Sequence, residues 1–421
     1  MRQVLHWPAF GSAVLTLVWA CAAGAAPCAS VSRANVARCA LAASLERQAS
    51  DAAVRATNGR VQATDPWLPS NPSLELSGSR RQGPATATLN WSASLGLELE
   101  IAGQRGARRS AALAERDAQS STKGGLERAI AAEALRLYYE LLAAREQQRV
   151  LQQMEATATR VWQAAQAAAE RGAAAGIEAD VADAARLATQ QQRLEATRAE
   201  RDATTALASL LGLASSSKLV VSGALEPLEA AASVPSGLSP PDSPEAVTLA
   251  AEKRAATARA SAFRRARVPN PTVSLFAQRD GFDENVLGLA LAVRLPLPQP
   301  LGRSLAGEIA ESEALAERAS LLVRQERWAS RAALARALVA FETAQEGSRA
   351  FSAERLQHAE QTLTSLASEV QAGRVPIRDA IIFQGPLLEL QLAAIAAQRA
   401  LCLASIEVVR AAGLPLLGAQ P

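Results

Sequence analysis

The 421-residue sequence predicts an α+β protein built from two tandem repeats, each with a pair of strands followed by a long helical hairpin. Three observations lead to this fold class. Residues 85–101 alternate strictly between apolar and polar positions, which is typical of a β-strand. Long alanine-rich stretches without proline follow and favour long helices. The same order of features then occurs a second time in the chain.

The bulk composition supports closely packed helices and excludes some classes of protein. The chain is 49% hydrophobic and 20% charged, but only 4% aromatic, whereas a large globular core normally relies on aromatic side chains. Alanine suits long helices that pack side by side. The formal net charge of +3 is small, and the charges of both signs are interspersed, so nothing indicates a nucleic-acid partner.

The N-terminus has the pattern of a signal peptide, which we assign to residues 1–25. Arg2 precedes an apolar run from about Ala9 to Ala20, and small residues continue to Ala26. The run is shorter than the ~20 residues of a membrane span. No later stretch reaches that length without charges, so we expect the mature chain to leave the cytoplasm without a membrane-spanning helix.

The four cysteines have different expected roles. Val18-Trp19-Ala20-Cys21 loosely resembles a lipobox, which makes Cys21 a candidate lipid anchor, while ordinary cleavage at residues 23–25 competes with this interpretation. Cys28 and Cys39 could pair in an oxidising compartment, although sequence alone does not establish the geometry. Cys402 lies in an apolar helical pattern, and we expect it to be a small core residue.

The repeats are visible as matching segments. Asn71–Leu76 is echoed by Asn270–Leu275, and each copy leads through a turn and an alternating segment to a Gly/Arg cluster that opens a helical region. Each helical region is expected to be interrupted once, near Gly172–Gly176 and near Gly373–Pro376. The predicted boundaries are residues 26–226 for the first repeat (strands about 72–101, hairpin about 104–212), 227–244 for the linker, and 245–421 for the second repeat (strands about 271–297, hairpin about 302–412).

The strands are too regular and too long for an ordinary soluble sheet. Every odd position from 85 to 101 is apolar, and residues 287–297 repeat the pattern less strictly. A soluble sheet with one face exposed to water gives the same alternation. Strands of soluble sheets are usually ~5–6 residues long, however, whereas membrane strands need ~9–11 residues. Four strands cannot enclose a barrel, and an open edge is not tolerated in lipid. Several chains would therefore close one barrel together, and the strand count allows either a dimer with eight strands or a trimer with twelve.

The helices are expected to be long and to pack as bundles. The stretch from about residue 104 to 171 would span on the order of 100 Å at ~1.5 Å per residue. Its packing positions are predicted from apolar spacing, as are those of the second copy: Leu135, Tyr138, Tyr139, Leu142, Leu334, Leu338 and Phe341. Pro386 interrupts the last helical pattern, and we predict a helix kink there.

With these segments assembled, the chain resembles the outer membrane efflux protein (TolC-type) family. The resemblance extends from about Cys39 to Pro415 and is greatest to the heavy-metal (cobalt-zinc-cadmium) resistance branch. Three sets of motifs support the resemblance. The first is the pair of Asn-Pro motifs at the strand starts, including the segment Val268–Leu275. The others are the segment Leu295-Pro296-Leu297 that leads to Gly302-Arg303, and the hairpin tips that begin with glycine.

The resemblance implies an α+β membrane protein in which a shared outer-membrane β-barrel, four strands per chain, continues as a long α-helical barrel in the periplasm. It implies a homotrimer in contact with outer-membrane lipid, a periplasmic adaptor and an inner-membrane pump. The chain would be a passive, gated conduit of a tripartite efflux system, with heavy-metal cations as a candidate cargo. The residues of the hairpin tips would face the adaptor: Gly172, Gly176, Gly373 and Arg374.

The resemblance also implies acidic residues that narrow the tunnel entrance just past the second tip. Asp379 lies six residues after Gly373 and matches the first such position, but the second is Ile382, so a double carboxylate ring is not expected. In the first copy Asp180 lies eight residues after Gly172, which implies a two-residue insertion. A ring of Asp379 side chains would attract cations. Alternatively, Asp379 only stabilises the first turn of a helix.

Other classes of protein have weaker support in the sequence. Catalysis usually depends on histidine, and only His358 remains after His6 leaves with the signal peptide. No phosphate loop or nucleophile elbow is present, and the few His, Cys and Met residues make a dedicated metal site or other cofactor unexpected. A periplasmic adaptor or a structural coiled-coil protein of an export complex is the main alternative. Adaptors usually have one hairpin, whereas two are predicted here.

Overall fold

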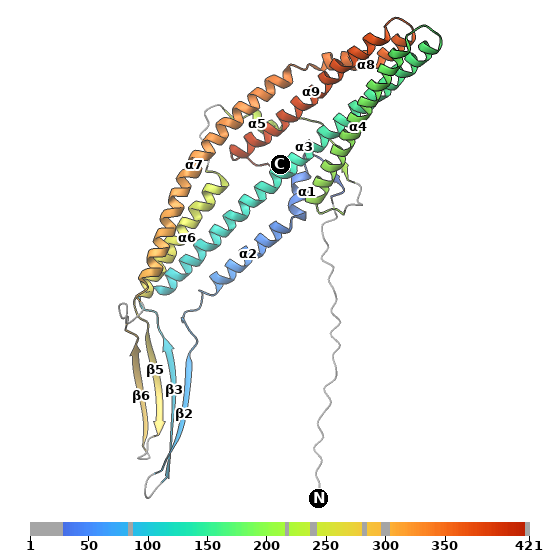
Figure 1. Ribbon diagram of the computed structural model, residues 1–421. Helices are drawn as coiled ribbons and strands as arrows, with labels where there is room; N and C mark the ends of the chain where they lie inside the picture. The colour runs from blue at the N-terminus through green and yellow to red at the C-terminus, as the bar shows by residue number, and fades with distance from the viewer. Residues whose placement is uncertain are drawn as a thin grey trace, which may run out of the picture.

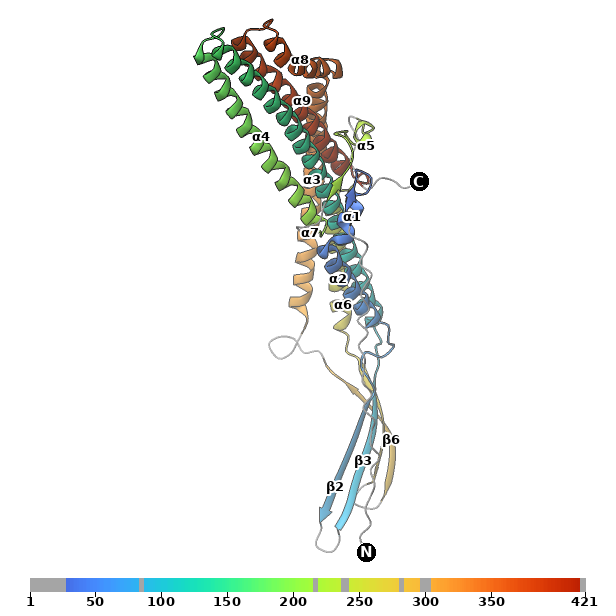
Figure 2. The same cartoon turned by 90° about the vertical axis from the view of Figure 1, so that its right-hand side faces the viewer.

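The computed structural model describes residues 28–82, 87–214, 219–235, 242–279, 284–295 and 304–416. The molecule is elongated, with a sheet at one end and helices that run away from it to two hairpin turns at the other end (Figures 1 and 2). The short helices α1 (Val36–Ala43) and α5 (Glu229–Ala232) lie between these two ends (Figure 1).

The sheet has four antiparallel strands, two from each half of the chain. The strands are β2 (Ser73–Gln82), β3 (Ala87–Glu98), β5 (Pro271–Arg279) and β6 (Asn285–Val293), in the order β2-β3-β5-β6. The pairing of β3 with β5 joins the two halves. Four strands were predicted, and all four are present. A separate parallel pair, β1 (Ser30–Val31) and β4 (Val220–Val221), ties the N-terminal segment to the stretch of chain that follows Leu210.

The helices of the first half are α1 (Val36–Ala43), α2 (Leu45–Gln62), α3 (Gln104–Glu170) and α4 (Gly176–Leu210). Those of the second half are α5 (Glu229–Ala232), α6 (Pro244–Ala266), α7 (Ala306–Arg349), α8 (Ala353–Gln371) and α9 (Ile377–Ala411). The 67 residues of α3 extend roughly 100 Å, as the sequence predicts. In each half a helix also precedes the strands, α2 or α6, and the sequence analysis assigned neither.

The second helical region is interrupted twice, so the prediction of a single interruption was wrong. Besides the turn between α8 and α9, the chain leaves the helix after Arg349 and starts α8 at Ala353. Ser352 has extended backbone angles, and its side-chain oxygen accepts a hydrogen bond from the backbone N–H of Arg355. This N-cap starts a new helix without proline or glycine.

The largest buried side chains form a cluster in the middle of the molecule. Tyr138 and Tyr139 of α3 are fully buried, with their rings edge to face at a centroid distance of 5.3 Å. Val31, Leu207 and Ile406 belong to the same cluster, which therefore joins α3, α4, α9 and the N-terminal segment. The predicted packing positions are confirmed: Leu135, Tyr138, Tyr139, Leu142, Leu334 and Phe341 are buried, and Leu338 is partly buried.

The segment that connects the two halves is fixed across these helices by side chains that bind its backbone. The Tyr138 hydroxyl donates to the carbonyl of Ser222 at 2.8 Å, and the Tyr139 hydroxyl donates to that of Glu226 at 2.6 Å. From α9, the Gln398 amide donates to the carbonyl of Leu225 at 2.6 Å. Each of these hydrogen bonds pairs a carbonyl of the connection with a donor on α3 or α9, and together they hold the connection against the two helices.

The cysteines fall into two groups. Cys28 and Cys39 form a disulfide with their Cα atoms 5.9 Å apart, which resolves the possibility that the sequence left open. Cys402 is free and fully buried among Tyr139 and its neighbours, as expected of a core residue. Cys21, the candidate lipid anchor, lies outside the described residues.

Burial of Cys402 leads to a prediction about its reactivity. Desolvation raises the pKa of its thiol to about 12, so at pH 8 the folded protein should expose no thiolate to alkylation. Because the unfolded thiol titrates near 9.0, stability should fall as the pH rises from about 9 towards 12. Mass spectrometry after N-ethylmaleimide treatment should detect modification of Cys402 only in denatured samples. Rapid labelling of the native protein would contradict this.

The last helix combines two features noted in the sequence. Within the described part of the chain, α9 is the one helix long and apolar enough to cross a membrane by length and composition, and its most apolar window is 39% buried. Buried core helices pass the same test, and α9 packs against α3, α7 and α8. The helix continues through Pro386, so this proline does not end it, and the expected bend there stays a prediction.

Candidate functional site

One face of the four-stranded sheet carries three apolar rows that run across its strands, and the next row on this face, Gly78, Trp91, Arg279 and Asn285, is mixed. The pairing aligns Leu74, Leu95, Leu275 and Leu289 in one row across the sheet. Two further rows lie on the same face: Leu76, Ala93, Ala277 and Leu287, and Leu97, Val273 and Leu291. Leu289 is 75% exposed and Leu74 is 67% exposed. The period-two pattern of the sequence thus produces a continuous apolar surface.

The opposite face of the sheet is predominantly polar or small. Its rows are Ser73, Gly96, Ser274 and Ala290; Glu75, Ser94, Phe276 and Gly288; and Ser77, Ser92, Gln278 and Val286. The hydroxyls of Ser77 and Ser92 lie 2.8 Å apart and share a hydrogen bond across the strands. Among the described strands, β2 and β6 each pair on one side only. The sheet is therefore two-faced and has two edges available for pairing.

A buried polar network joins the sheet to the helices. Gln104, the first residue of α3, is 3% exposed and donates to the carbonyl of Val268 and to the Asn270 side-chain oxygen, both at 3.1 Å. The Asn270 amide in turn donates to Glu98 at 2.8 Å. The asparagine of the second Asn-Pro motif thus links β3, β5 and α3. We infer that these bonds fix the direction in which the strands leave the helical region.

The two hairpin tips have the same backbone geometry and lie at the same end of the molecule (Figures 1 and 2). Gly172 and Gly373 have positive φ angles of 72° and 70°. At the first tip the N–H groups of Gly172 and Ala173 bond to the carbonyls of Ala169 and Ala168. The bonds from Gly373 and Arg374 to Val370 and Glu369 are equivalent. Helices α3 and α8 therefore both end in a Schellman motif, which requires a residue in the left-handed conformation.

This geometry predicts different effects for neighbouring glycines. Gly172→Ala and Gly373→Ala should each destabilise a tip by about 1–2 kcal/mol, because a Cβ atom is disfavoured at positive φ. Gly176→Ala is the matched control, since Gly176 begins α4 and has open space around it. Hydrogen exchange of the tip amides should increase in the first two variants and not in the third. Equal exchange in all three would contradict the assignment.

The other predicted tip residues differ in their surroundings. Gly176 is the first residue of α4, just past the turn. Arg374 is exposed, and its guanidinium forms an ion pair with Glu369 of α8 at 2.7 Å. A cluster of Val161, Leu366, Ala367, Val370 and Ala380 packs the end of α3 against α8 and α9 just below the tips. The tips are thus short turns of mostly small or apolar residues, with Arg374 in the second, on an apolar base.

The structure corrects the alignment of the acidic residues. Asp379 is half-buried and lies in the first turn of α9, three residues after its N-cap Pro376. The equivalent position three residues after the N-cap Ala175 of α4 is Glu178. Asp180 is exposed and lies two residues further on. No two-residue insertion exists, because the tips are equally long. The sequence analysis missed Glu178, which the fixed separation of 201 residues between Gly172 and Gly373 would have identified.

Neither Asp379 nor Asp180 has a hydrogen bond or ion pair with a residue that the structure describes. Within the same described ranges, no group of three His, Cys, Asp or Glu side chains could hold a metal ion.

Comparison with known proteins gives the family context. Residues 36–213 match the family model described as outer membrane efflux protein. No curated protein matches the sequence. Among solved structures, CusC, studied for folding and transmembrane channel formation, has a TM-score of 0.74 at 15% identity, over 91% of this chain and 92% of CusC.

Two further structures are similar to the chain. The outer membrane protein VceC from Vibrio cholerae has a TM-score of 0.70 at 16% identity, over 91% of this chain and 96% of VceC. The CmeC outer membrane channel from Campylobacter jejuni has a TM-score of 0.70 at 13% identity, over 90% of this chain and 85% of CmeC. At these identities the comparison establishes a shared fold.

Proposed function

We propose that this chain is an outer membrane efflux protein, the outer-membrane channel subunit of a tripartite efflux system. The observation that carries the proposal is the four-stranded sheet, which has an exposed apolar face, a polar opposite face and two unpaired edges among the described strands. A membrane strand needs apolar residues towards lipid, and every strand edge within lipid must be paired. The match of residues 36–213 to the family supports the same function.

Barrel closure requires further copies of the chain. Edge strand β2 of one copy would pair with edge strand β6 of the next, because those are the strands with a free side in the described sheet. A homotrimer would then supply twelve strands, an even number within the range of bacterial barrels. The apolar rows would face lipid, and the polar rows would line the interior.

The helical end of the molecule would extend into the periplasm and meet the rest of the system. The exposed tips at Gly172 and Gly373 would face a periplasmic adaptor, which in turn contacts an inner-membrane pump. Asp379, with Glu178 and Asp180 on the neighbouring hairpin, would place carboxylates near the tunnel entrance. In a trimer these groups would favour cations over anions.

Heavy-metal cations are the cargo that the sequence resemblance suggests. The described residues offer no metal-binding cluster, so passage would depend on repeated weak attraction rather than on a binding station. The chain would act as a passive conduit, with no catalytic residue and no cofactor of its own, and the pump would supply the energy.

Envelope fractionation followed by cross-linking tests the proposal. The test uses chains that carry one cysteine in each edge strand, for example Ser77→Cys in β2 together with Ala290→Cys in β6. A disulfide between copies would then report pairing of these two edges. The proposal expects protein in the outer membrane and a disulfide-linked ladder that ends at the trimer. A soluble or inner-membrane monomer would overturn it and favour a periplasmic adaptor instead.

A further inference from the structure

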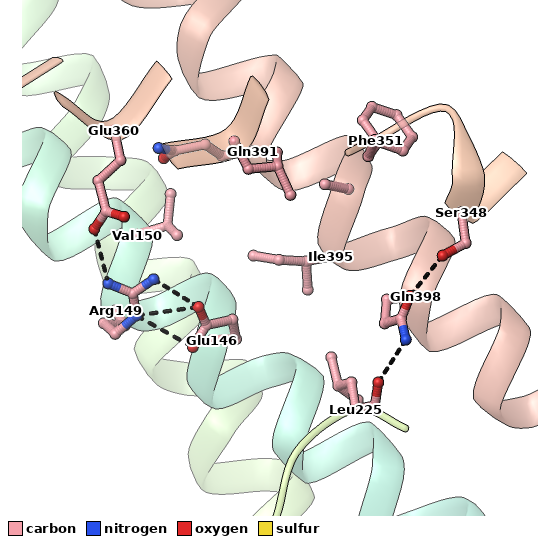
Figure 3. Close-up of a pocket in the computed structure, with 12 residues that line it drawn as sticks. Glu146, Arg149, Val150, Leu225, Ser348, Phe351, Glu360, Gln391, Ile395 and Gln398 are labelled. Carbon is pink, nitrogen blue, oxygen red and sulfur yellow. Dashed lines mark hydrogen bonds and ion pairs between the residues drawn. The ribbon is translucent and has the colours of Figure 1, made fainter. Parts of the chain in front are cut away.

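A cavity of about 280 Å³ lies where α7 ends and α8 begins, midway along the helical region. Its lining comes from five segments: α3, the connection at Leu225, the end of α7, the start of α8, and α9 (Figure 3). The unpredicted break at residues 350–352 forms part of its rim. The volume is just below the lower end of the ~300–1,000 Å³ range of small-molecule sites, so it suits a small ligand.

The centre of the cavity is apolar. Val150 of α3 and Ile395 of α9 project towards its middle, and the Phe351 ring lies on the side of the α7–α8 break (Figure 3). Ile395 and Val150 are buried, with 8% and 3% of their surface exposed. Contact with these side chains would remove the apolar surface of a ring-shaped ligand from water.

The polar groups are confined to two opposite sides (Figure 3). On one side, Gln398 accepts a hydrogen bond from Ser348 and donates one to the carbonyl of Leu225, both at 2.6 Å, so this wall is neutral and its groups are mutually satisfied. On the other side, Arg149 forms ion pairs with Glu146 at 2.6 Å and with Glu360 at 3.4 Å. Two carboxylates thus share one guanidinium, which leaves an excess of one negative charge.

We propose that this cavity binds a small amphipathic monocation, with its ring against Val150, Ile395 and Phe351 and its positive charge beside Glu146 and Glu360. The net charge of the wall selects a cation over a neutral or anionic molecule of the same shape. Since the lining joins α8 to α3 and α9, an occupied cavity would hold the start of α8 in place. This inference concerns a site in the chain itself and does not depend on the proposed function.

The test uses the purified full-length chain in detergent and two rigid fluorescent probes of similar shape. N-methylacridinium carries one positive charge, and 9-methylanthracene carries none. Fluorescence anisotropy titrations would be compared between variants, because partition of a probe into micelles is the same for all of them. Ala394→Trp fills the cavity, since Ala394 lines it and is 9% exposed. It should weaken binding of both probes at least about tenfold, and its melting temperature checks that it folds.

Removing one carboxylate distinguishes the contribution of the charged side of the cavity to binding from that of its apolar centre. Glu360→Gln should weaken N-methylacridinium binding about two- to fivefold, as expected of a half-exposed ion pair, and leave 9-methylanthracene binding unchanged. Glu354→Gln is the control, because Glu354 is on the same helix but does not line the cavity. Wild-type protein without saturable binding, or equal binding by wild type and Ala394→Trp, would overturn the proposal. An equal response of both probes to Glu360→Gln would overturn the choice of a cation.

Discussion

Leu289→Arg is expected to prevent most of the protein from assembling in the outer membrane. Leu289 is the middle residue of β6, is 75% exposed, and stands in the apolar row that crosses all four strands. If this face contacts lipid, an arginine at the membrane midplane costs about 2–4 kcal/mol per chain. In a shared barrel the cost is repeated in each copy. Sucrose-gradient fractionation and the yield of cross-linked trimer measure the effect.

Ala290→Arg is the control for this experiment. Ala290 is the next residue of the same strand, is also exposed, and pairs with Ser274 on the polar face. Because its side chain would point to the polar interior, we expect nearly normal membrane assembly. If both arginine variants assemble equally well, the apolar rows do not face lipid, and the sheet would be an ordinary sheet with one wet face.

The sheet was the part of the fold most readily predicted from sequence. One face is built of apolar rows and the other mainly of polar or small residues, so the alternation from residue 85 to 101 is visible without structural data. The ends of α3 and α8 were also predictable, because Gly172 and Gly373 mark Schellman motifs. The disulfide between Cys28 and Cys39 was not, since it depends on how close the folded chain brings two cysteines.

Other features left weaker signals in the sequence. The α7–α8 break depends on the N-cap Ser352 alone, without glycine or proline. The start of α6 was placed within the linker, although Ser243-Pro244-Glu245 is a helix-start signal and the Ser243 hydroxyl accepts from the N–H of Ala246. Glu178 lies six residues after Gly172, as Asp379 does after Gly373, and it was missed because the first tip was compared at Asp180 instead. The cavity required packing of five separate segments, which no local pattern encodes.

The second large effect is expected at Tyr139, which supports the core and the connection between the two halves. Tyr139→Ala removes a fully buried aromatic ring, for which about 3–5 kcal/mol of stability is the usual loss. Burial raises the pKa of Tyr139 above its ordinary value of 10.0, so its hydroxyl stays protonated and continues to donate to the carbonyl of Glu226 in mildly alkaline solution. Because Tyr139→Ala loses this buried ring, its melting temperature in detergent should fall strongly.

Tyr139→Phe separates the two roles, because it keeps the ring and removes only the hydroxyl. The carbonyl of Glu226 then loses this hydrogen bond, and because Glu226 is exposed and water can replace the donor, a loss of only about 0.5–1.5 kcal/mol is expected. Tyr138→Phe should behave alike, since Tyr138 binds the carbonyl of Ser222 in the same connection. Hydrogen exchange should increase in residues 219–228 in both phenylalanine variants and leave the tips unchanged. If Tyr139→Phe is as stable and as protected as wild type, packing against α3 alone holds the connection, and the hydroxyls do not tether it.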